Sequence, residues 1–105
     1  MTTFNDREKG FENKFAHDAE MQFKAQARTN KMLGLWAASL LGKSGDEANA
    51  YALEVVKADF AEEGHEDVYR KLAADLDYRA DEQTIRAKMT EFLGLAKAQL
   101  FNDAS

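Results

Sequence analysis

The apolar residues of this 105-residue chain recur every three or four positions in four successive stretches. This spacing places side chains on one face of an α-helix. The stretches predict helices over residues 17–41, 46–61, 65–77 and 82–101. Because each helix has a single apolar face and needs partners, we expect an all-α, four-helix bundle-like domain over residues 17–105.

The side chains expected in the core of this domain share the same periodic placement. They are Phe23, Leu33, Trp36, Leu40, Tyr51, Val55, Phe60, Leu72, Leu76, Ile85, Met89, Phe92 and Leu93. Gly34 and Gly94 lie inside helical stretches. They either let two helices approach closely or cost about 1 kcal/mol each relative to alanine.

Residues between the stretches predict where the helices start and stop. Ser44, with Glu47 three residues later, forms a capping box for the second helix. Asp81 suits the N-cap position of the last helix. Gly42 and Gly64 suit the positions that follow the ends of the first and second helices.

The first 16 residues form a separate pattern. At 100° per residue, Phe4, Phe11 and Phe15 fall within about 20° of one line, and Arg7 and Lys14 flank that line. Helices this short are marginal in water on their own. We therefore expect an arm that is poorly ordered alone and becomes helical on a partner. The alternative is that the three rings extend the first helix and pack on the protein's own core.

Composition narrows the fold and the kind of partner. Three valines and one isoleucine are too few to cover a sheet, and the absence of cysteine excludes disulfides and thiolate sites. The net charge of -5 argues against nucleic acid as a partner. The longest apolar run, Met32–Leu41, is far shorter than the roughly 20 residues of a membrane span, so we expect no membrane insertion. Residues 1–31 carry six Lys and Arg against five Asp and Glu, whereas residues 32–105 carry eight against fourteen.

Candidate chemistry is sparse. His17 and His65 lie among acidic residues without the spacing of a metal-binding helix, so no metal site is expected. The stretch from Asp75 to Asp81 starts like a calcium loop but lacks its later ligands and its glycine. No nucleotide-binding or nucleophile motif is present, so an enzyme is unsupported and no cofactor is expected. His17 lies between arm and domain, where it is either a hinge or pH-sensing residue or a polar residue at a helix start.

Two segments carry a resemblance to a known family. The sequence FENKFAHD at residues 11–18, followed by NKMLGLWAA at residues 30–38, resembles the zeta subunit of alphaproteobacterial F-type ATP synthases, an inhibitor of their ATPase activity. The opening FNDREK at residues 4–9 also fits that pattern. The similarity is detailed from residue 2 to 42 and looser to about residue 101.

The resemblance implies a four-helix protein whose N-terminal segment blocks ATP hydrolysis. That segment, here residues 2–17, would enter a catalytic α/β interface and contact the central stalk. The implied partner-binding residues are the apolar anchors and two cations of the arm: Phe4, Arg7, Phe11, Lys14 and Phe15. The resemblance also implies a monomer when free, in the cytoplasm at the inner face of the cell membrane. The alternative function is a non-inhibitory helical adaptor or a small-ligand-binding bundle.

Overall fold

The computed structural model describes residues 19–60 and 65–104 of the chain. Within these ranges there is no β-strand, and the residues form four α-helices and one short 3-10 turn. The elements are α2 (Ala19–Leu40), α3 (Gly45–Ala58), α4 (Glu66–Leu76), η1 (Asp77–Arg79) and α5 (Glu82–Ala104). The all-α, four-helix fold class is therefore confirmed. Each expected helix overlaps one observed helix, and their ends differ by at most three residues.

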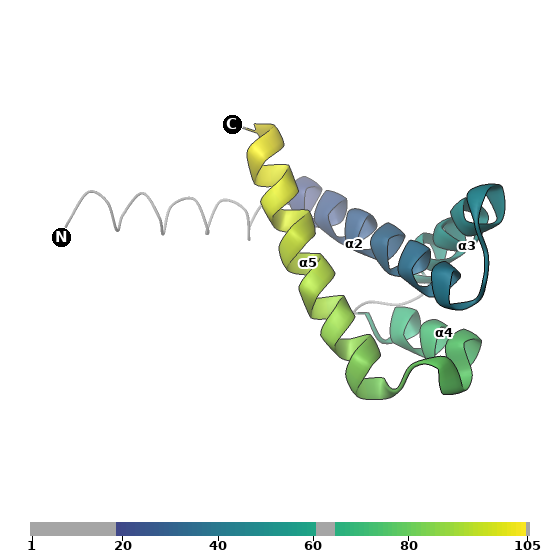
Figure 1. Cartoon of the computed structure of the whole chain (residues 1–105). Helices are drawn as coiled ribbons and strands as arrows, with labels where there is room; N and C mark the ends of the chain where they lie inside the picture. Colours follow the sequence, from purple (N-terminus) through teal and green to yellow (C-terminus); the bar gives the residue numbers. More distant parts are fainter. Residues whose placement is uncertain (1–18, 61–64, 105) are drawn as a thin grey trace.

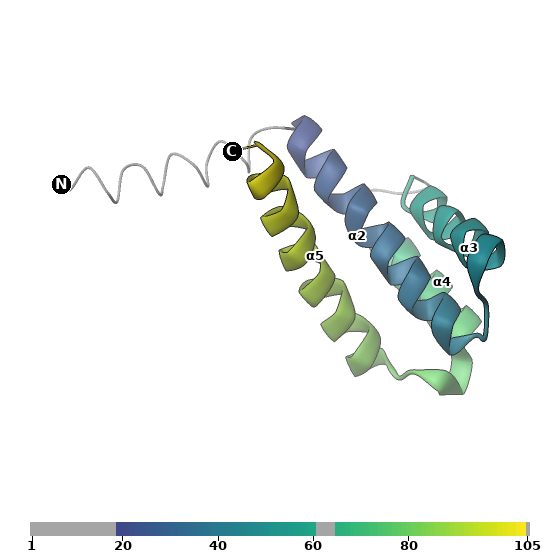
Figure 2. The ribbon, with the colours of Figure 1, turned by 45° about the horizontal axis from the view of Figure 1, so that its top comes forward.

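Helix α2 is the central element of the fold. It makes its most extensive contacts with α3 and then with α5, while α4 contacts all three other helices. Figure 2 shows α2 and α5 side by side over most of their length, with α4 behind α2. The start of α2 and the end of α5 consequently lie at the same end of the domain.

The main core forms where the four helices meet. Its buried side chains among the described residues are Leu33, Ala37 and Ala38 of α2, Tyr51 and Val55 of α3, Val68, Leu72 and Leu76 of α4, and Ile85 of α5. A smaller cluster joins the start of α2 to the end of α5, with Ala25 and Leu100 buried against Met21 and Phe101. Burying each large aliphatic side chain stabilises the fold by about 1.5–3 kcal/mol.

Most of the side chains expected in the core are at least half-buried. The buried ones are Leu33, Tyr51, Val55, Leu72, Leu76 and Ile85. Trp36, Met89 and Phe92 are half-buried against this core, and Leu93 is also half-buried. The interior is therefore built largely from the positions that helical periodicity selects.

Three of the expected core residues lie on the surface instead. Phe23, Leu40 and Phe60 are 57%, 40% and 62% exposed, so their assignment to the core is wrong. Leu40 is the last residue of α2 and precedes a turn rather than a packed helix. Because α3 ends at Ala58, Phe60 leaves the helix and stacks on Phe23 at the surface.

The helix ends follow the sequence signals in part. Gly42 has a φ of +78°, and the N–H groups of Gly42 and Lys43 donate to the carbonyls of Ser39 and Ala38 at 3.2 and 2.8 Å. These two bonds make the expected glycine C-terminal motif.

The start of α3 differs from its expected capping box. Ser44 occupies the N-cap position, but its side chain makes no capping hydrogen bond, so the capping box is wrong. Gly45, with a φ of +56°, separates Ser44 from the regular helical backbone. The helix also ends before the expected stop at Gly64, which lies outside the described residues.

Candidate functional site beside the N-terminal segment

The side chains that the sequence assigns to partner binding lie outside the described residues. They are Phe4, Arg7, Phe11, Lys14 and Phe15, and the hinge candidate His17 also lies outside. The described chain starts at Ala19, the first residue of α2. The candidate site is therefore built from the first half of α2 and the residues that pack against it.

Two phenylalanines stack on the surface of this part of the domain. Phe23 lies one turn into α2 and Phe60 follows the end of α3, and their ring centroids are 5.8 Å apart with 27° between the ring planes. Aromatic pairs contribute about 0.5–1.5 kcal/mol beyond the area they bury. The stack holds the end of α3 against α2, while more than half of each residue stays exposed.

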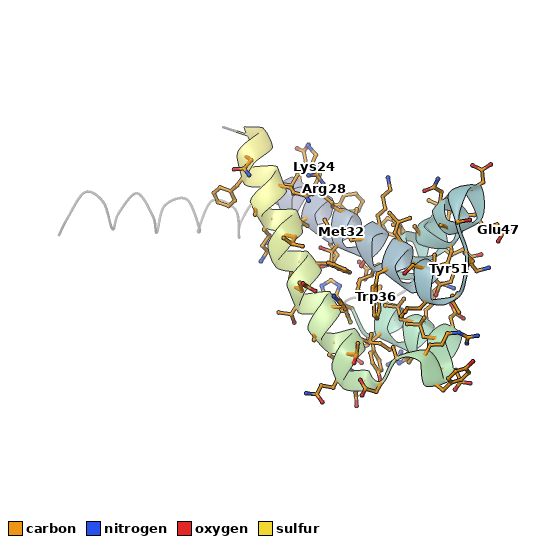
Figure 3. The ribbon with its side chains drawn as sticks, viewed as in Figure 1. Lys24, Arg28, Met32, Trp36, Glu47 and Tyr51 are labelled. Atoms are coloured by element: carbon orange, nitrogen blue, oxygen red, sulfur yellow. The ribbon has the colours of Figure 1, made fainter. Side chains whose placement is uncertain are left out.

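The same stretch of α2 is basic. Lys24, Arg28, Met32 and Trp36 follow one another along the helix at intervals of four residues (Figure 3). Lys24 Nζ lies 3.0 Å from Glu20 Oε1, and Arg28 Nη1 donates to Gln99 Oε1 of α5 at 3.3 Å. The basic end of α2 therefore also helps to hold α5.

Buried polar groups fix the end of α3 to α2. Asn30 is 1% exposed; it accepts a hydrogen bond from Gln26 Nε2 at 3.0 Å and donates one to Asp59 Oδ2 at 2.9 Å. The other oxygen of Asp59 lies 3.2 Å from His65 Nδ1. Asp59 follows α3 and His65 precedes α4. These polar contacts therefore connect α2, α3 and α4 beside the phenylalanine pair.

Sequence reasoning missed the two buried polar residues of α2. Thr29 is 1% exposed, like Asn30, and its hydroxyl donates to the Ala25 carbonyl at 2.7 Å. Ala25, Thr29, Leu33 and Ala37 recur every four residues, which is the signal that could have placed Thr29 inside. The burial of Asn30 depends instead on its distant partner Asp59.

A cavity of about 350 Å³ lies between α2 and α5 at the start of α4. Its apolar wall includes Leu33, Met89 and Leu93. Its polar wall includes Thr29, His65, Glu66 and Arg86. The cavity therefore joins an apolar surface to groups of both charges.

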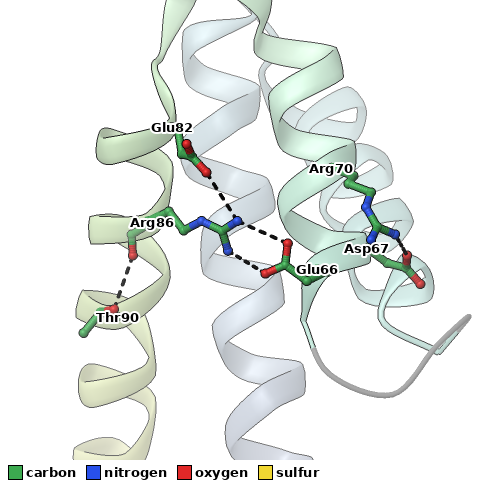
Figure 4. A network of polar contacts seen from close by, with 6 residues as sticks. All are labelled: Glu66, Asp67, Arg70, Glu82, Arg86 and Thr90. Atoms are coloured by element: carbon green, nitrogen blue, oxygen red, sulfur yellow. Dashed lines mark hydrogen bonds and ion pairs between the residues drawn. The ribbon is translucent and has the colours of Figure 1, made fainter.

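Arg86 of α5 is held firmly at this cavity. Its Nη1 and Nη2 donate to the two carboxylate oxygens of Glu66 at 2.8 and 3.1 Å, and Nη2 also reaches Glu82 Oε2 at 3.4 Å (Figure 4). The guanidinium carbon lies 3.9 Å from the centroid of the Tyr69 ring. The hydrogen bonds from Arg86 lower the pKa of Glu66, and the same bonds raise the pKa of Arg86. Arg86 and Glu66 thus form a charged pair at neutral pH that joins α5 to α4.

Acidic residues around the turn after α4 have structural partners. Asp75 Oδ2 accepts hydrogen bonds from Tyr51 Oη at 2.8 Å and from Lys71 Nζ at 3.0 Å. Asp81 Oδ1 accepts a hydrogen bond from the Thr84 N–H at 2.8 Å, so Asp81 is the N-cap of α5, as predicted. In the part of the chain that the structure describes, no three His, Cys, Asp or Glu side chains are grouped to hold a metal ion.

The comparison with known families shows to which family this chain belongs. The family model of the ATPase inhibitor subunit zeta matches residues 1–99. The chain belongs to that family. The match confirms the resemblance seen in the N-terminal segment and in α2, and it extends over nearly the whole zeta-family chain.

A solved structure supports the zeta-family fold. That structure, determined by solution NMR, is 63% identical in sequence and superposes with a TM-score of 0.73. The similarity covers 79% of this chain and 98% of the other. No curated protein is similar enough to this chain to count as a relative.

Membership of this family supports a role as an inhibitor of ATP synthase. A family of inhibitor subunits suggests a non-catalytic protein, and its description supports an association with ATP synthase. Among the described helices, none is long and apolar enough to cross a membrane.

Proposed function

We propose that this zeta-family chain inhibits ATP hydrolysis by an F-type ATP synthase through its N-terminal segment. The observation that supports this most is the family match, which starts at residue 1 and so includes Phe4, Phe11 and Phe15. The segment enters a catalytic α/β interface near the central stalk. Its bound helix prevents that interface from closing, which stops hydrolysis.

The chemistry of the segment suits such a site. Phe4, Phe11 and Phe15 act as apolar anchors along one line of a helix. Arg7 and Lys14 beside them meet acidic groups on the catalytic subunits. Because anchors at this spacing share a face only in a helix, binding and helix formation are coupled.

The segment is continuous in sequence with the four-helix domain, since residues 1–18 directly precede α2. In the proposed complex the segment lies within the interface and the folded domain stays outside it. The partners are then the catalytic α and β subunits and the central stalk. Inhibition takes place in the cytoplasm at the inner face of the cell membrane, and the free protein is a monomer.

An ATPase assay tests this function. We compare the full chain with a chain that lacks residues 1–17 and with the triple variant F4S/F11S/F15S. We expect the full chain to inhibit hydrolysis and both altered chains to lose inhibition. The matched control is L95S, which changes an exposed leucine of α5 that is 47% exposed. Equal inhibition by the full and shortened chains would contradict the role of the segment.

His17 offers a separate test of regulation. An unperturbed histidine titrates near pH 6.5, and His17 lies where the segment joins the domain. If it acts as a pH sensor at this junction, H17Q changes the pH dependence of inhibition between about pH 6 and 7.5. An unchanged pH profile in H17Q would remove this role and leave the inhibitory function intact.

A further inference from the structure

We propose that the exposed Phe23–Phe60 pair is a second docking surface, which binds the catalytic subunits of the ATP synthase beside the interface that receives the N-terminal segment. This inference rests on the proposed function and extends it from the segment to the folded domain. The partner surface is apolar with acidic groups around it. Three observations carry the proposal: the exposure of the rings, their position and the charge of α2.

The exposure of the pair is the first observation. Phe23 and Phe60 are 57% and 62% exposed although their rings stack on each other. Burying an aromatic side chain removes roughly 150–250 Å² from water, so the two rings together offer about 200 Å² of apolar surface. Scattered apolar residues are common on protein surfaces. Two stacked rings from separate elements form a contiguous patch of a residue type that is enriched at the centre of protein–protein interfaces.

The position of the pair is the second observation. The N-terminal segment meets α2 at Ala19, and Phe23 follows four residues later. Four residues span about 6 Å along a helix axis. A partner that holds the N-terminal segment therefore lies within reach of the Phe23 side chain, and Phe60 extends the same contact toward α3.

The charge of this part of α2 is the third observation. From its start to Lys31, α2 carries Lys24, Arg28 and Lys31 against the single acid Glu20, while the whole chain has a net charge of -5. The helix that carries Phe23 is therefore the basic part of an acidic protein. Complementary charge steers association and fixes the orientation of a bound partner.

The pair is also held in place before binding. Asp59, the residue before Phe60, accepts the hydrogen bond from Asn30 at 2.9 Å and lies 3.2 Å from His65 Nδ1. These contacts fix the end of α3 against α2. A preorganised surface loses less conformational entropy on binding.

The test uses the full chain and an F-type ATPase freed of its own inhibitor. The double variant F23S/F60S removes both rings, and circular dichroism checks that it keeps its helices. The matched control L95S/Y78S removes two side chains that are 47% and 83% exposed, on α5 and η1. F4S/F11S/F15S reports on the N-terminal segment separately. The readouts are the inhibitor concentration that halves ATPase activity and the residual activity at saturation.

We expect F23S/F60S to raise the half-inhibiting concentration at least tenfold while inhibition at saturation stays complete. The control should match the wild-type chain. Unchanged potency of F23S/F60S, together with lost inhibition by F4S/F11S/F15S, overturns the second docking surface and leaves the proposed function standing. Full inhibition by F4S/F11S/F15S overturns the proposed function instead.

Two further outcomes assign the pair to another occupant and overturn the proposal. Greater potency of F23S/F60S would mean that the N-terminal segment itself covers the rings in the free protein. A wild-type dimer in sedimentation that F23S/F60S abolishes would mean that a second copy covers them. The proposal requires a monomer whose potency falls when the rings are removed.

Discussion

Gly34 of α2 lies so close to Ala52 of α3 that a Cβ atom at position 34 would stand 2.4 Å from the Ala52 Cα and 2.9 Å from its Cβ. Real side chains do not tolerate such distances, and the closer neighbour is backbone that cannot turn away. The contact between α2 and α3, the most extensive in the domain, therefore depends on a glycine at this position. Of the two roles that the sequence allows for Gly34, close helix approach is the correct one.

The first prediction is that G34A destabilises the domain. The added methyl group forces α2 and α3 apart, and overpacking of this kind costs about 1–3 kcal/mol. Alanine gains up to about 1 kcal/mol of helix propensity, which offsets part of that cost. We expect a net loss of about 1–2 kcal/mol in the free energy of unfolding, measured by urea denaturation.

G94A is the matched control for this substitution. Gly94 lies inside α5, and a Cβ atom there has nothing within 4 Å. The same chemical change should therefore stabilise the domain by up to about 1 kcal/mol. If G34A and G94A shift stability in the same direction, the close approach at Gly34 does not limit the packing.

The contrast between these glycines shows which parts of the fold helical periodicity predicts and which it does not. Helical spacing predicts the elements and most of the core because both depend on residues three and four positions apart. It assigns Phe23 to the interior because it records which face of a helix is apolar, not whether another helix covers that face. It assigns Phe60 to the interior because the apolar pattern continues past Ala58, where α3 ends. Whether Gly34 meets a neighbour and Gly94 does not is equally a matter of tertiary placement.

The polar part of the candidate site depends on distant pairs. Asp81 could be predicted as an N-cap because its partner Thr84 is three residues away. Asn30 is buried because Asp59, 29 residues along the chain, accepts its hydrogen bond. A single sequence does not reveal such pairs, since nothing in the local pattern connects the two residues.

The second prediction concerns Tyr51 and the pH dependence of stability. Burial raises the pKa of the Tyr51 hydroxyl, and its hydrogen bond to Asp75 raises it further. Burial opposes ionisation of Asp75, but hydrogen bonds from Lys71 and Tyr51 outweigh it and hold the pKa of that carboxyl below its ordinary value. Removing the hydroxyl in Y51F should cost about 1 kcal/mol at pH 7.

The sign of the alkaline effect follows from these shifts. Tyr51 stays protonated in the folded state, so the stability it provides is complete below about pH 10 and is lost as the pH rises further. Y51F lacks this loss. The difference in unfolding free energy between wild type and Y51F should therefore shrink above about pH 10. A constant difference from pH 7 to 11 would contradict the role of the hydroxyl.

The third prediction concerns the pair that joins α4 to α5. The hydrogen bonds from Arg86 are the main cause of the lowered pKa of Glu66. R86Q should raise the pKa of Glu66 toward its ordinary value, which NMR titration of the side-chain carboxyl measures directly. R79Q is the control, because Arg79 lies over Tyr78 rather than beside Glu66.

The linked effect on stability has a defined direction. A lowered pKa means that Glu66 stabilises the fold above the pKa of the unfolded chain, and that this contribution disappears as the pH falls through the folded value. R86Q should therefore destabilise the domain more at pH 7 than in acid. An equal effect at both pH values would show that Arg86 acts through packing on Tyr69 alone.

The last prediction concerns the backbone between α4 and α5. Asp77 has a φ of +51° and a ψ of -122°, a left-handed backbone that glycine adopts without strain. Such strain in a residue with a side chain costs about 1–3 kcal/mol. Glycine relieves this strain in the folded state, but its greater conformational freedom in the unfolded chain offsets part of the stability gained. We expect D77G to raise the free energy of unfolding by about 1 kcal/mol.

D77A removes the same carboxylate but keeps the Cβ atom, so it isolates the effect of charge. D77G should be more stable than D77A in thermal and urea unfolding, because only the glycine relieves the backbone. Equal stability of the two variants would show that the turn relaxes without strain and that any change comes from the lost charge at the end of α4.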